Sequence, residues 1–246
     1  MGWSWLRRGR AAGPLLPSPG PCRPRRHTLR TERLLLYTPE TSLDLAAALA
    51  AASDAEAQRW LGWGERVLTD THVIETLLGL RPGDTGTLRS SRMIRNLLAQ
   101  PYEPGPDDEV LLVGVRLDDG RYAGSTGVHP GTGEIGGWLA PDARGQGLGT
   151  ELFRAAVLLG HTHLGLRTVR AGHEPANSAS ARALANAGLT AADGPPRHTL
   201  PDGREIDSHW LEHTTTPPTT HCPAADPPPP PPDAPGRPLP RRRPPQ

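Results

Sequence analysis

The sequence predicts an α/β sandwich in which helices flank a mixed, mostly antiparallel sheet. Three consecutive strand-like segments, separated by turn residues, occupy residues 110–140 and indicate an antiparallel meander. From residue 148 the apolar residues follow the 3.6-residue period of an amphipathic helix. Strand and helix patterns then alternate to residue 211, which gives the order β-α-α-(α)-β-β-β-α-β-α-β.

The first predicted elements are a strand and a helix. Leu29–Tyr37 has the apolar and β-branched content of a strand, and Pro39 closes it. Ser42 is placed to cap an alanine-rich helix that runs to about Ala52.

The next stretch is expected to be a loop followed by two helices. Glycines interrupt residues 54–66, where Trp60 and Trp63 could either cap the core or wall a binding pocket. Apolar residues at helical spacing predict helices over Thr71–Leu80 and Ser90–Gln100.

The predicted meander has strands at Val110–Leu117, Tyr122–His129 and Glu134–Ala140. Asp118-Asp119-Gly120 joins the first two, and a Gly next to Asp at this position is a strong hairpin signal. Residues 130–133, Pro-Gly-Thr-Gly, form the second turn.

The C-terminal part alternates helices and strands. One apolar face from Leu148 to Leu159 predicts a helix that ends near Gly160. A short strand at Thr168–His173 precedes a helix over Asn177–Ala187, which Gly188 should terminate in the left-handed conformation. Ile206–Leu211 is the last expected strand.

Composition indicates one domain between two disordered ends. Residues 1–28 are rich in arginine and proline, and residues 214–246 are mostly proline and threonine, a composition that cannot bury a core. Residues 29–213 are long enough for a single core of ordinary size.

The near-neutral net charge of +1 conceals an acidic middle. Residues 31–213 hold 16 arginines and 24 acidic residues, a net charge of −8, which disfavours nucleic-acid binding and suits an amine-bearing substrate.

The chain has no lysine, so no mechanism can use a catalytic lysine. No stretch approaches the 18 apolar residues of a membrane span, so no membrane partner is expected. Cys22 and Cys222 lack metal-ligand or redox spacing, which fits a reducing cytoplasm.

A glycine-rich loop joins the third meander strand to the following helix. Bare N–H groups at a helix N-terminus bind anions, above all phosphate. Gly145, Gly147 and Gly149 have the spacing G-x-G-x-G and follow a meander, so the loop is not the G-x-G-x-x-G of a dinucleotide site. A nucleotide P-loop requires a lysine, which this chain lacks.

Arg144–Gly149 matches [Arg/Gln]-x-x-Gly-x-[Gly/Ala] at every fixed position and resembles the pyrophosphate loop of the GNAT acetyltransferase superfamily. Glu134–Pro141, Glu-Ile-Gly-Gly-Trp-Leu-Ala-Pro, resembles its ribosomal-protein N-acetyltransferase branch, the RimJ/RimL-like proteins. Asn177-x-x-Ser180, followed by Gly188-Leu189, is similar to the second motif of that branch, and Leu29–Leu36 to its opening.

The resemblance implies a GNAT-like acyl-CoA N-acyltransferase fold, splayed at the cofactor strand, and acetyl-CoA as co-substrate. The pantetheine arm would follow Trp138–Ala140, with a backbone N–H near Leu139 facing the thioester oxygen. The residues implied in acetyl-CoA binding are Trp138, Leu139, Ala140, Arg144, Gly145, Gln146, Gly147, Leu148, Gly149, Thr150 and Asn177.

The resemblance also suggests catalytic roles. Glu134 is the candidate base for the amine proton, although a glutamate at a strand start could simply be solvated. Many family members have a tyrosine acid where this chain has Leu184, which leaves Ser180 or water to protonate the thiolate. Asn177 could contact pantetheine, cap its helix, or do both. His173 is a weaker base candidate, and His161 and His163 have no carboxylate or cysteine at ligand spacing, so no metal is expected.

The resulting hypothesis is a cytoplasmic acetyl-CoA-dependent N-acetyltransferase that acts on a primary amine by direct transfer. A protein N-terminal α-amine is the first expected acceptor, and a small amine such as an amino acid or antibiotic is the second. Two alternatives are a non-catalytic acyl-CoA-binding regulator and an adaptor that acts through the proline-rich tail.

Overall fold

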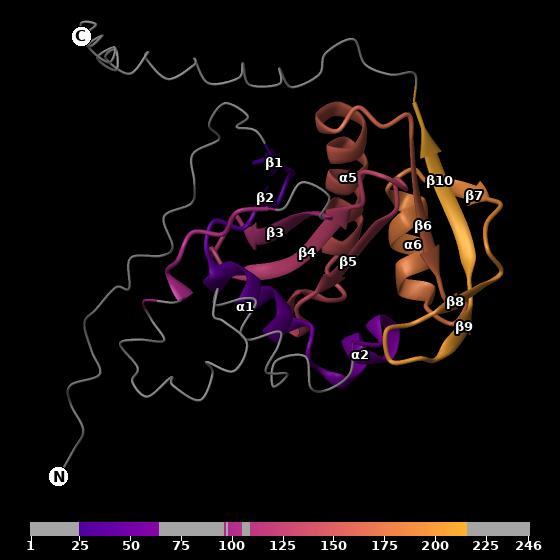
Figure 1. Ribbon diagram of the computed structural model, residues 1–246, viewed down its shortest axis with the longest axis horizontal. Coiled ribbons are helices and arrows are strands. Elements are labelled where there is room, and N and C mark those ends of the chain that lie inside the picture. Colours follow the sequence, from indigo (N-terminus) through magenta and orange to yellow (C-terminus); the bar gives the residue numbers. More distant parts are fainter. Residues whose placement is uncertain (1–24, 64–95, 97, 105–108, 216–246) are drawn as a thin grey trace, which may run out of the picture.

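The computed structural model describes residues 25–63, 96, 98–104 and 109–215, which form the layered α/β arrangement of Figure 1. The central sheet is antiparallel throughout and has the order β1-β2-β3-β4-β5. Its strands are β1 (Thr28–Arg30), β2 (Leu34–Tyr37), β3 (Val110–Arg116), β4 (Tyr122–Val128) and β5 (Ile135–Leu139). The predicted meander is therefore confirmed as β3-β4-β5.

The single strand predicted over Leu29–Tyr37 was wrong, because the chain reverses within it. β1 and β2 pair antiparallel, with Thr28 opposite Tyr37. Thr31 stabilises the reversal: its N–H donates to the Leu34 carbonyl at 2.9 Å, and its hydroxyl accepts the Leu34 N–H at 3.0 Å. A polar turn inside an apolar run outweighed the strand propensity of its neighbours.

Two short helices follow. α1 (Ser42–Ala51) begins one residue after its cap, which is Thr41 rather than the predicted Ser42. The predicted loop over 54–66 was also wrong in part, because it contains α2 (Ala55–Leu61). The Asp54 carboxylate caps α2 by accepting the N–H groups of Glu56 and Ala57.

The helix predicted over Thr71–Leu80 lies outside the described residues, and the one over Ser90–Gln100 lies largely outside them. The same holds for most of the two expected disordered ends, 1–28 and 214–246.

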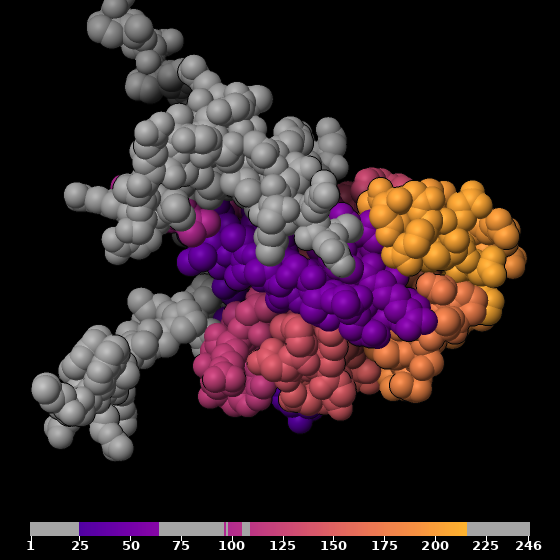
Figure 2. All heavy atoms as spheres, turned by 90° about the horizontal axis from the view of Figure 1, so that it is seen from below, coloured from indigo at the N-terminus to yellow at the C-terminus, as the bar shows by residue number. Residues whose placement is uncertain are grey.

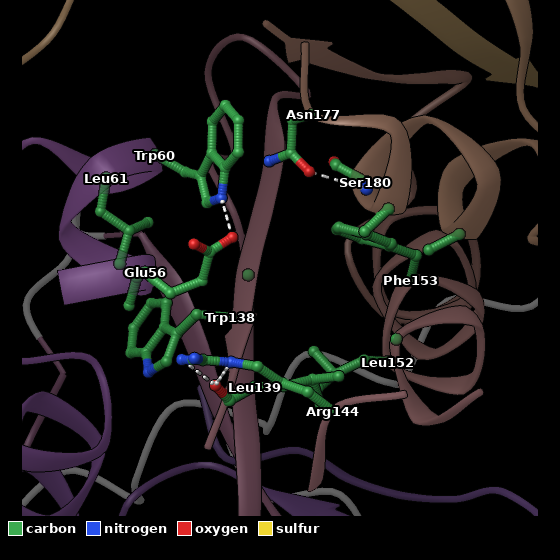
Figure 3. Close-up of a pocket in the computed structure, with 15 residues that line it drawn as sticks. Glu56, Trp60, Leu61, Trp138, Leu139, Arg144, Leu152, Phe153, Asn177 and Ser180 are labelled. Carbon is green, nitrogen blue, oxygen red and sulfur yellow. Dashed lines mark hydrogen bonds between the residues drawn. The ribbon is translucent and has the colours of Figure 1, made fainter. Parts of the chain in front are cut away.

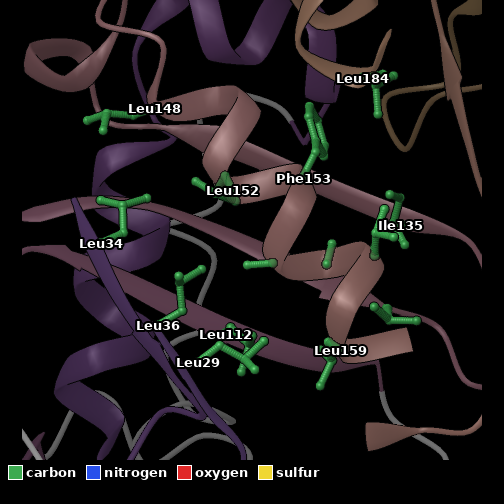
Figure 4. Packing of buried hydrophobic residues seen from close by; sticks show 14 of the residues in the cluster. Leu29, Leu34, Leu36, Leu112, Ile135, Leu148, Leu152, Phe153, Leu159 and Leu184 are labelled. Carbon is green, nitrogen blue, oxygen red and sulfur yellow. The ribbon is translucent and has the colours of Figure 1, made fainter. Parts of the chain in front are cut away.

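One helix, α5 (Leu148–Leu158), supplies much of the core. Its apolar face packs against β2, β4 and β5, with Leu148, Leu152 and Ala156 buried (Figure 4). The helix does not stop near Gly160 as predicted but continues through a π-helical turn at Leu159–His163. α1 contacts β3 and β4, and Trp138 of β5 donates its indole N–H to the carbonyl of Ala48 in α1.

A second sheet continues the fold beyond β5. It has the order β6-β10-β7, with β6 at Thr168–His173, β7 at Thr190–Ala192 and β10 at His209–Thr214. The single last strand predicted over Ile206–Leu211 was wrong, because the chain divides it at Ser208. Its first two residues belong to β9 (Glu205–Asp207), which forms a separate hairpin with β8 (Arg197–Thr199), and its last three belong to β10.

The two sheets meet at one end of β5. Glu134 and Arg170 form a parallel bridge, and the Arg170 N–H donates to the Gly133 carbonyl at 2.9 Å. All the described strand pairs are antiparallel, so this parallel bridge between β5 and β6 is what makes the strand arrangement mixed. α6 (Ser178–Asn186) follows β6 and packs against α5.

Candidate acetyl-CoA and acceptor site

Within the described part of the chain, one edge of β5 has no strand paired to it beyond the bridge between Glu134 and Arg170 of β6. Glu134 accepts the His129 N–H, and Ala140 donates to the Ala123 carbonyl, so the even-numbered residues of β5 pair with β4. Alternate residues of an antiparallel pair direct their backbone groups to opposite edges. The N–H and C=O groups of Gly137 and Leu139 therefore face away from β4, into the space between the sheets.

The glycine loop leads from this edge into α5. Gly145 and Gly147 have φ values of 73° and 78°, in the left-handed region that glycine tolerates best. The N–H groups of residues 145–148 have no hydrogen-bond acceptor within the described part of the chain. Unpaired N–H groups at the positive end of a helix dipole form an anion site. The loop therefore fits a pyrophosphate group.

Arg144 is held away from the loop amides. Its guanidinium makes a two-point ion pair with Asp54, at 2.8 Å and 2.6 Å, and also donates to the Leu139 carbonyl (Figure 3). The hydrogen bond from Arg144 lowers the pKa of Asp54 to about 2. The predicted contact of Arg144 with pyrophosphate stays a prediction, and it would require this ion pair to open.

A second arginine supports the loop. Arg33 donates to the Gln146 carbonyl at 2.7 Å and to Glu151, in the first turn of α5, at 2.5 Å. Burial works to raise the pKa of Glu151, but hydrogen bonds from Thr31 and Arg33 outweigh it and lower that pKa. Arg33 therefore fixes a loop carbonyl in place, which leaves the neighbouring N–H groups free for a ligand.

Two cavities join along the open edge of β5. The first, which we name the loop cavity, has a volume of about 200 Å³ and is lined by residues near the loop, including Leu139, Arg144 and Gly149. The second, which we name the Glu134 cavity, has a volume of about 350 Å³ and is lined by Glu134 and by residues of β6 and the β8–β9 hairpin. Both cavities share the lining residues Trp60, Leu61, Gly137, Phe153, Asn177 and Ser180.

α2 closes one side of both cavities. Arg204 of the β8–β9 hairpin donates to the carbonyls of Gln58 and Arg59 in α2, at 3.2 Å and 3.1 Å. Figure 2 shows the purple segment that contains α1 and α2 lying across the molecule toward the yellow C-terminal strands. Residues more than 140 positions apart thus enclose one cleft.

The predicted second motif lies at the junction of the cavities. Asn177 is the N-cap of α6, and its side-chain oxygen accepts the Ser180 N–H at 3.0 Å (Figure 3). The capping interpretation is therefore confirmed, and its lining position leaves a ligand contact compatible with it. Leu184, in place of a tyrosine, is buried and lines the Glu134 cavity.

Five of the eleven predicted binding residues line the loop cavity: Trp138, Leu139, Arg144, Gly149 and Asn177. The other six do not line it, and several of them can contribute only backbone. Leu148 and Ala140 are buried in the core, and Thr150 donates its N–H to the Gly147 carbonyl. Gln146 turns its side chain to the Asp142 carbonyl. Phosphate binding at this loop would thus use main-chain groups above all.

Glu134 lies at the opposite end of β5, exposed and lining the second cavity. It faces the same side of the sheet as Gly136 and Trp138, since side chains alternate along a strand. His173 and Glu174 line the same cavity from the end of β6.

Sequence reasoning missed Asp54, Arg33 and Glu174. Asp54 had a detectable signal, because Ser-Asp before Ala-Glu-Ala is a typical N-cap pattern. The pairing of Arg33 with Glu151 joins residues 118 positions apart, for which the sequence has no local signal.

Within the described ranges, no group of three or more His, Cys, Asp or Glu side chains is arranged to hold a metal ion. None of the helices described there is long and apolar enough to cross a membrane.

Comparisons with known proteins agree with this geometry. Residues 33–190 match the sequence profile of the acetyltransferase (GNAT) domain. A Vibrio cholerae protein proposed to be a ribosomal-protein-serine acetyltransferase has a similar structure, with a TM-score of 0.53 and 13% identity over 77% of this chain and 98% of that one. A GNAT-family acetyltransferase from Bacillus anthracis has a TM-score of 0.52 and 18% sequence identity, over 76% of this chain and 98% of that one. An acetyltransferase from Agrobacterium tumefaciens has a TM-score of 0.50 and 20% sequence identity, over 77% of this chain and 95% of that one.

No curated protein matches the chain significantly. The structural similarities, at such low identity, establish the fold, which is the GNAT fold. The profile match covers well over half of the chain, and the cleft along β5 has the open edge, glycine loop and second motif that the resemblance implied. The chain belongs to the GNAT acetyltransferase family.

Proposed function

We propose that the protein is an acetyl-CoA-dependent N-acetyltransferase that transfers an acetyl group directly to a primary amine in a ternary complex. The observation that carries this proposal is the continuous cleft along β5. It runs from amides without acceptors at the loop to the carboxylate of Glu134. Residues 29–213 form the catalytic domain of this proposal.

The cofactor half relies on backbone groups. The amides of 145–148 would bind the pyrophosphate, and the open edge at Gly137 and Leu139 would pair with the pantetheine amides. Acetyl-CoA supplies the acetyl group as a thioester, and the Leu139 N–H would polarise its carbonyl. Arg144 adds a cation beside the cleft even while it is paired with Asp54.

The acceptor half requires a base. Glu134 takes a proton from the amine, directly or through water, so that the nitrogen can form a C–N bond as the C–S bond breaks. The sulfur leaves as a thiolate and receives a proton from Ser180 or from water. Ser180 lines both cavities, which is the position this role requires.

A protein N-terminal α-amine is the first proposed acceptor, and a small-molecule amine is the second. The resemblance to the RimJ/RimL-like branch supports the first. The enclosed volume of about 350 Å³ beside Glu134 supports the second. The proposed setting is the cytoplasm, where the two cysteines would remain reduced.

The paired variants Glu134→Gln and Glu174→Gln test the catalytic assignment, because both carboxylates line the same cavity. Glu134→Gln should lower kcat by roughly 100-fold, the usual effect of losing a general base, with the Kd of acetyl-CoA unchanged. Glu174→Gln should change kcat by no more than a few fold relative to the unsubstituted protein, and should change the KM of the amine instead.

Release of coenzyme A thiol, measured with a panel of peptides and amines, gives kcat, and calorimetry gives the Kd. Unchanged acetylation by Glu134→Gln would refute the assigned base. Tight acetyl-CoA binding without turnover of any amine would favour the non-catalytic regulator.

A further inference from the structure

Aromatic side chains gather around the cleft. Phenylalanine, tryptophan and tyrosine make up only 4% of the chain. All four tryptophans in the described ranges, and Phe153, line one or both cavities: Trp60, Trp63, Trp138 and Trp210. The buried core, by contrast, consists mainly of leucine, alanine and valine. Phe153 belongs to this core, but none of the four tryptophans does, so packing of the core does not account for their position.

These indole rings offer apolar surface rather than hydrogen bonds. Trp60 donates its N–H to Glu56 at 2.9 Å, and Trp210 donates to the Pro195 carbonyl at 2.8 Å. The N–H of Trp138 is likewise bound to Ala48. A ligand in the Glu134 cavity would thus meet ring faces and edges, which bind apolar and cationic groups.

The charges that line the Glu134 cavity are few and acidic. Glu134 and Glu174 are its carboxylates, and no arginine is among its lining residues in the described ranges. Arg170, close by, stacks on Trp210 at 4.1 Å from the ring centroid. The two carboxylates suit one ammonium group. The rest of the wall is mixed: the β8–β9 hairpin contributes the apolar Leu200, Pro201 and Ile206, and the polar lining residues are His173, Asn177, Ser180, His198 and Ser208.

The volume also limits the acceptor. At about 350 Å³ the cavity is at the lower end of the roughly 300–1,000 Å³ that small-molecule sites occupy. A polyamine would bring further ammonium groups into a cavity whose only carboxylates in the described ranges are Glu134 and Glu174, and an unpaired charge there is costly.

We propose that the acceptor is a monoamine in which a short linker joins the amine to an aromatic ring. The ammonium end lies between Glu134 and Glu174, and the ring lies among the tryptophans. The shared chemistry occurs both in a free arylalkylamine and in a peptide whose first residue is aromatic. This inference rests on the proposed function and names the acceptor class for the same site.

Gly136 offers a way to fill the cavity without disturbing the fold. A Cβ at this position would meet no atom within 4 Å among the described residues, and Gly136 lines the Glu134 cavity. Its neighbour Gly137 differs, because a Cβ there would approach the Ser125 carbonyl oxygen to 2.7 Å. Substituting Gly136 therefore adds volume beside Glu134 and Trp138 without a clash.

The experiment measures kcat/KM for 2-phenylethylamine, spermidine and ethylamine, and for two tetrapeptides that differ only in a first residue of phenylalanine or alanine. The aromatic member should exceed its non-aromatic counterpart by about tenfold or more, as burial of a ring predicts. The ratio of kcat/KM for 2-phenylethylamine to kcat/KM for the phenylalanine peptide shows whether the acceptor is a free amine or a peptide.

The variants Gly136→Ala and Gly136→Leu should then lower kcat/KM for the aromatic acceptors progressively, by at least tenfold for leucine. The Kd of acetyl-CoA should not change, and ethylamine should be affected less. Ala185→Leu, an exposed position of α6 that lines neither cavity, serves as the control for folding.

Preference for spermidine or for the alanine peptide would overturn the acceptor class while leaving acetyl transfer intact. An equal effect of Gly136→Leu on every acceptor would also overturn it. Failure to acetylate any amine, with acetyl-CoA bound normally, would instead refute the proposed function on which the inference rests.

Discussion

The two ends of the cleft are built in different ways. The loop end comes from one continuous segment, 135–150, and offers mainly main-chain groups whose positions follow from strand pairing and glycine conformation. The Glu134 end is assembled from side chains of α2, β5, β6, β10 and the β8–β9 hairpin. Backbone chemistry at the loop end suits a ligand that every family member shares. Side-chain chemistry at the other end can differ from one protein to the next.

Substitution of a loop glycine is expected to distinguish the two ends of the cleft most strongly. In Gly145→Val a β-branched residue must adopt φ near 73°, which costs about 1–2 kcal/mol unless the loop changes shape. The Kd of acetyl-CoA should rise at least tenfold. Gly203→Val places the same strain, at φ 87°, on the hairpin turn and should leave that Kd unchanged. Equal effects of the two variants on acetyl-CoA binding would argue against a phosphate site at the loop.

The Asp54–Arg144 ion pair joins the two ends, since Asp54 caps α2 and Arg144 begins the loop. Asp54→Asn keeps an oxygen that can cap the helix but removes the charge, so we expect a loss of about 1 kcal/mol in the free energy of unfolding. Glu205→Gln breaks the exposed pair with Arg197 and should cost almost nothing. Urea denaturation measures both.

A smaller effect is expected from Arg33, which donates a hydrogen bond to the Gln146 carbonyl of the loop. Arg33→Gln should raise the KM of acetyl-CoA several-fold with kcat unchanged, because the loop amides lose their fixed orientation. Arg33→Lys should recover part of this loss. Arg154→Gln, on the exposed face of the same helix α5, is the control. A lower kcat with unchanged KM would show that Arg33 does not act through the loop.

The smallest effect concerns pH at the loop end. Because the pKa of Asp54 is lowered to about 2, the stability that its ion pair contributes is fully present above pH 4 and is lost only as the pH falls toward 2. The Kd of acetyl-CoA should therefore be flat between pH 7 and 9. The rate of acetyl transfer should rise over the same range as the amine of the acceptor loses its proton. If the Kd of acetyl-CoA and the rate of acetyl transfer changed with pH in the same way, the assignment of the pH dependence to the acceptor amine would be contradicted.

The sequence predicted the loop end better than the other end for a physical reason. Strand alternation, hairpin chemistry and positive-φ glycines act within a few residues, so the meander, Gly147 before α5 and the Asn177 cap could all be predicted. The turn at Thr31 was missed although its hydrogen bonds to Leu34 are local, because Leu29 and the apolar residues after Arg33 favoured one strand; its further partner, Glu151, lies 120 residues away.

The acceptor end was less predictable because its residues meet only in the tertiary structure. Trp60 and Trp63 were left open between core and pocket, and the structure assigns both to the Glu134 cavity wall. Trp210 and Glu174 had no local pattern that would relate them to Glu134. The β8–β9 hairpin lies in a polar stretch with little strand propensity, and its pairing depends on a turn at Gly203.

Amide hydrogen exchange with and without acetyl-CoA tests the central claim most directly. The amides of 145–148 lack acceptors in the described structure, and those of Gly137 and Leu139 face the open edge of β5. Acetyl-CoA should slow exchange at these positions and leave the β8–β9 hairpin unchanged. Protection confined to the hairpin, or none along the loop and β5, would contradict the assignment of the loop end to the cofactor.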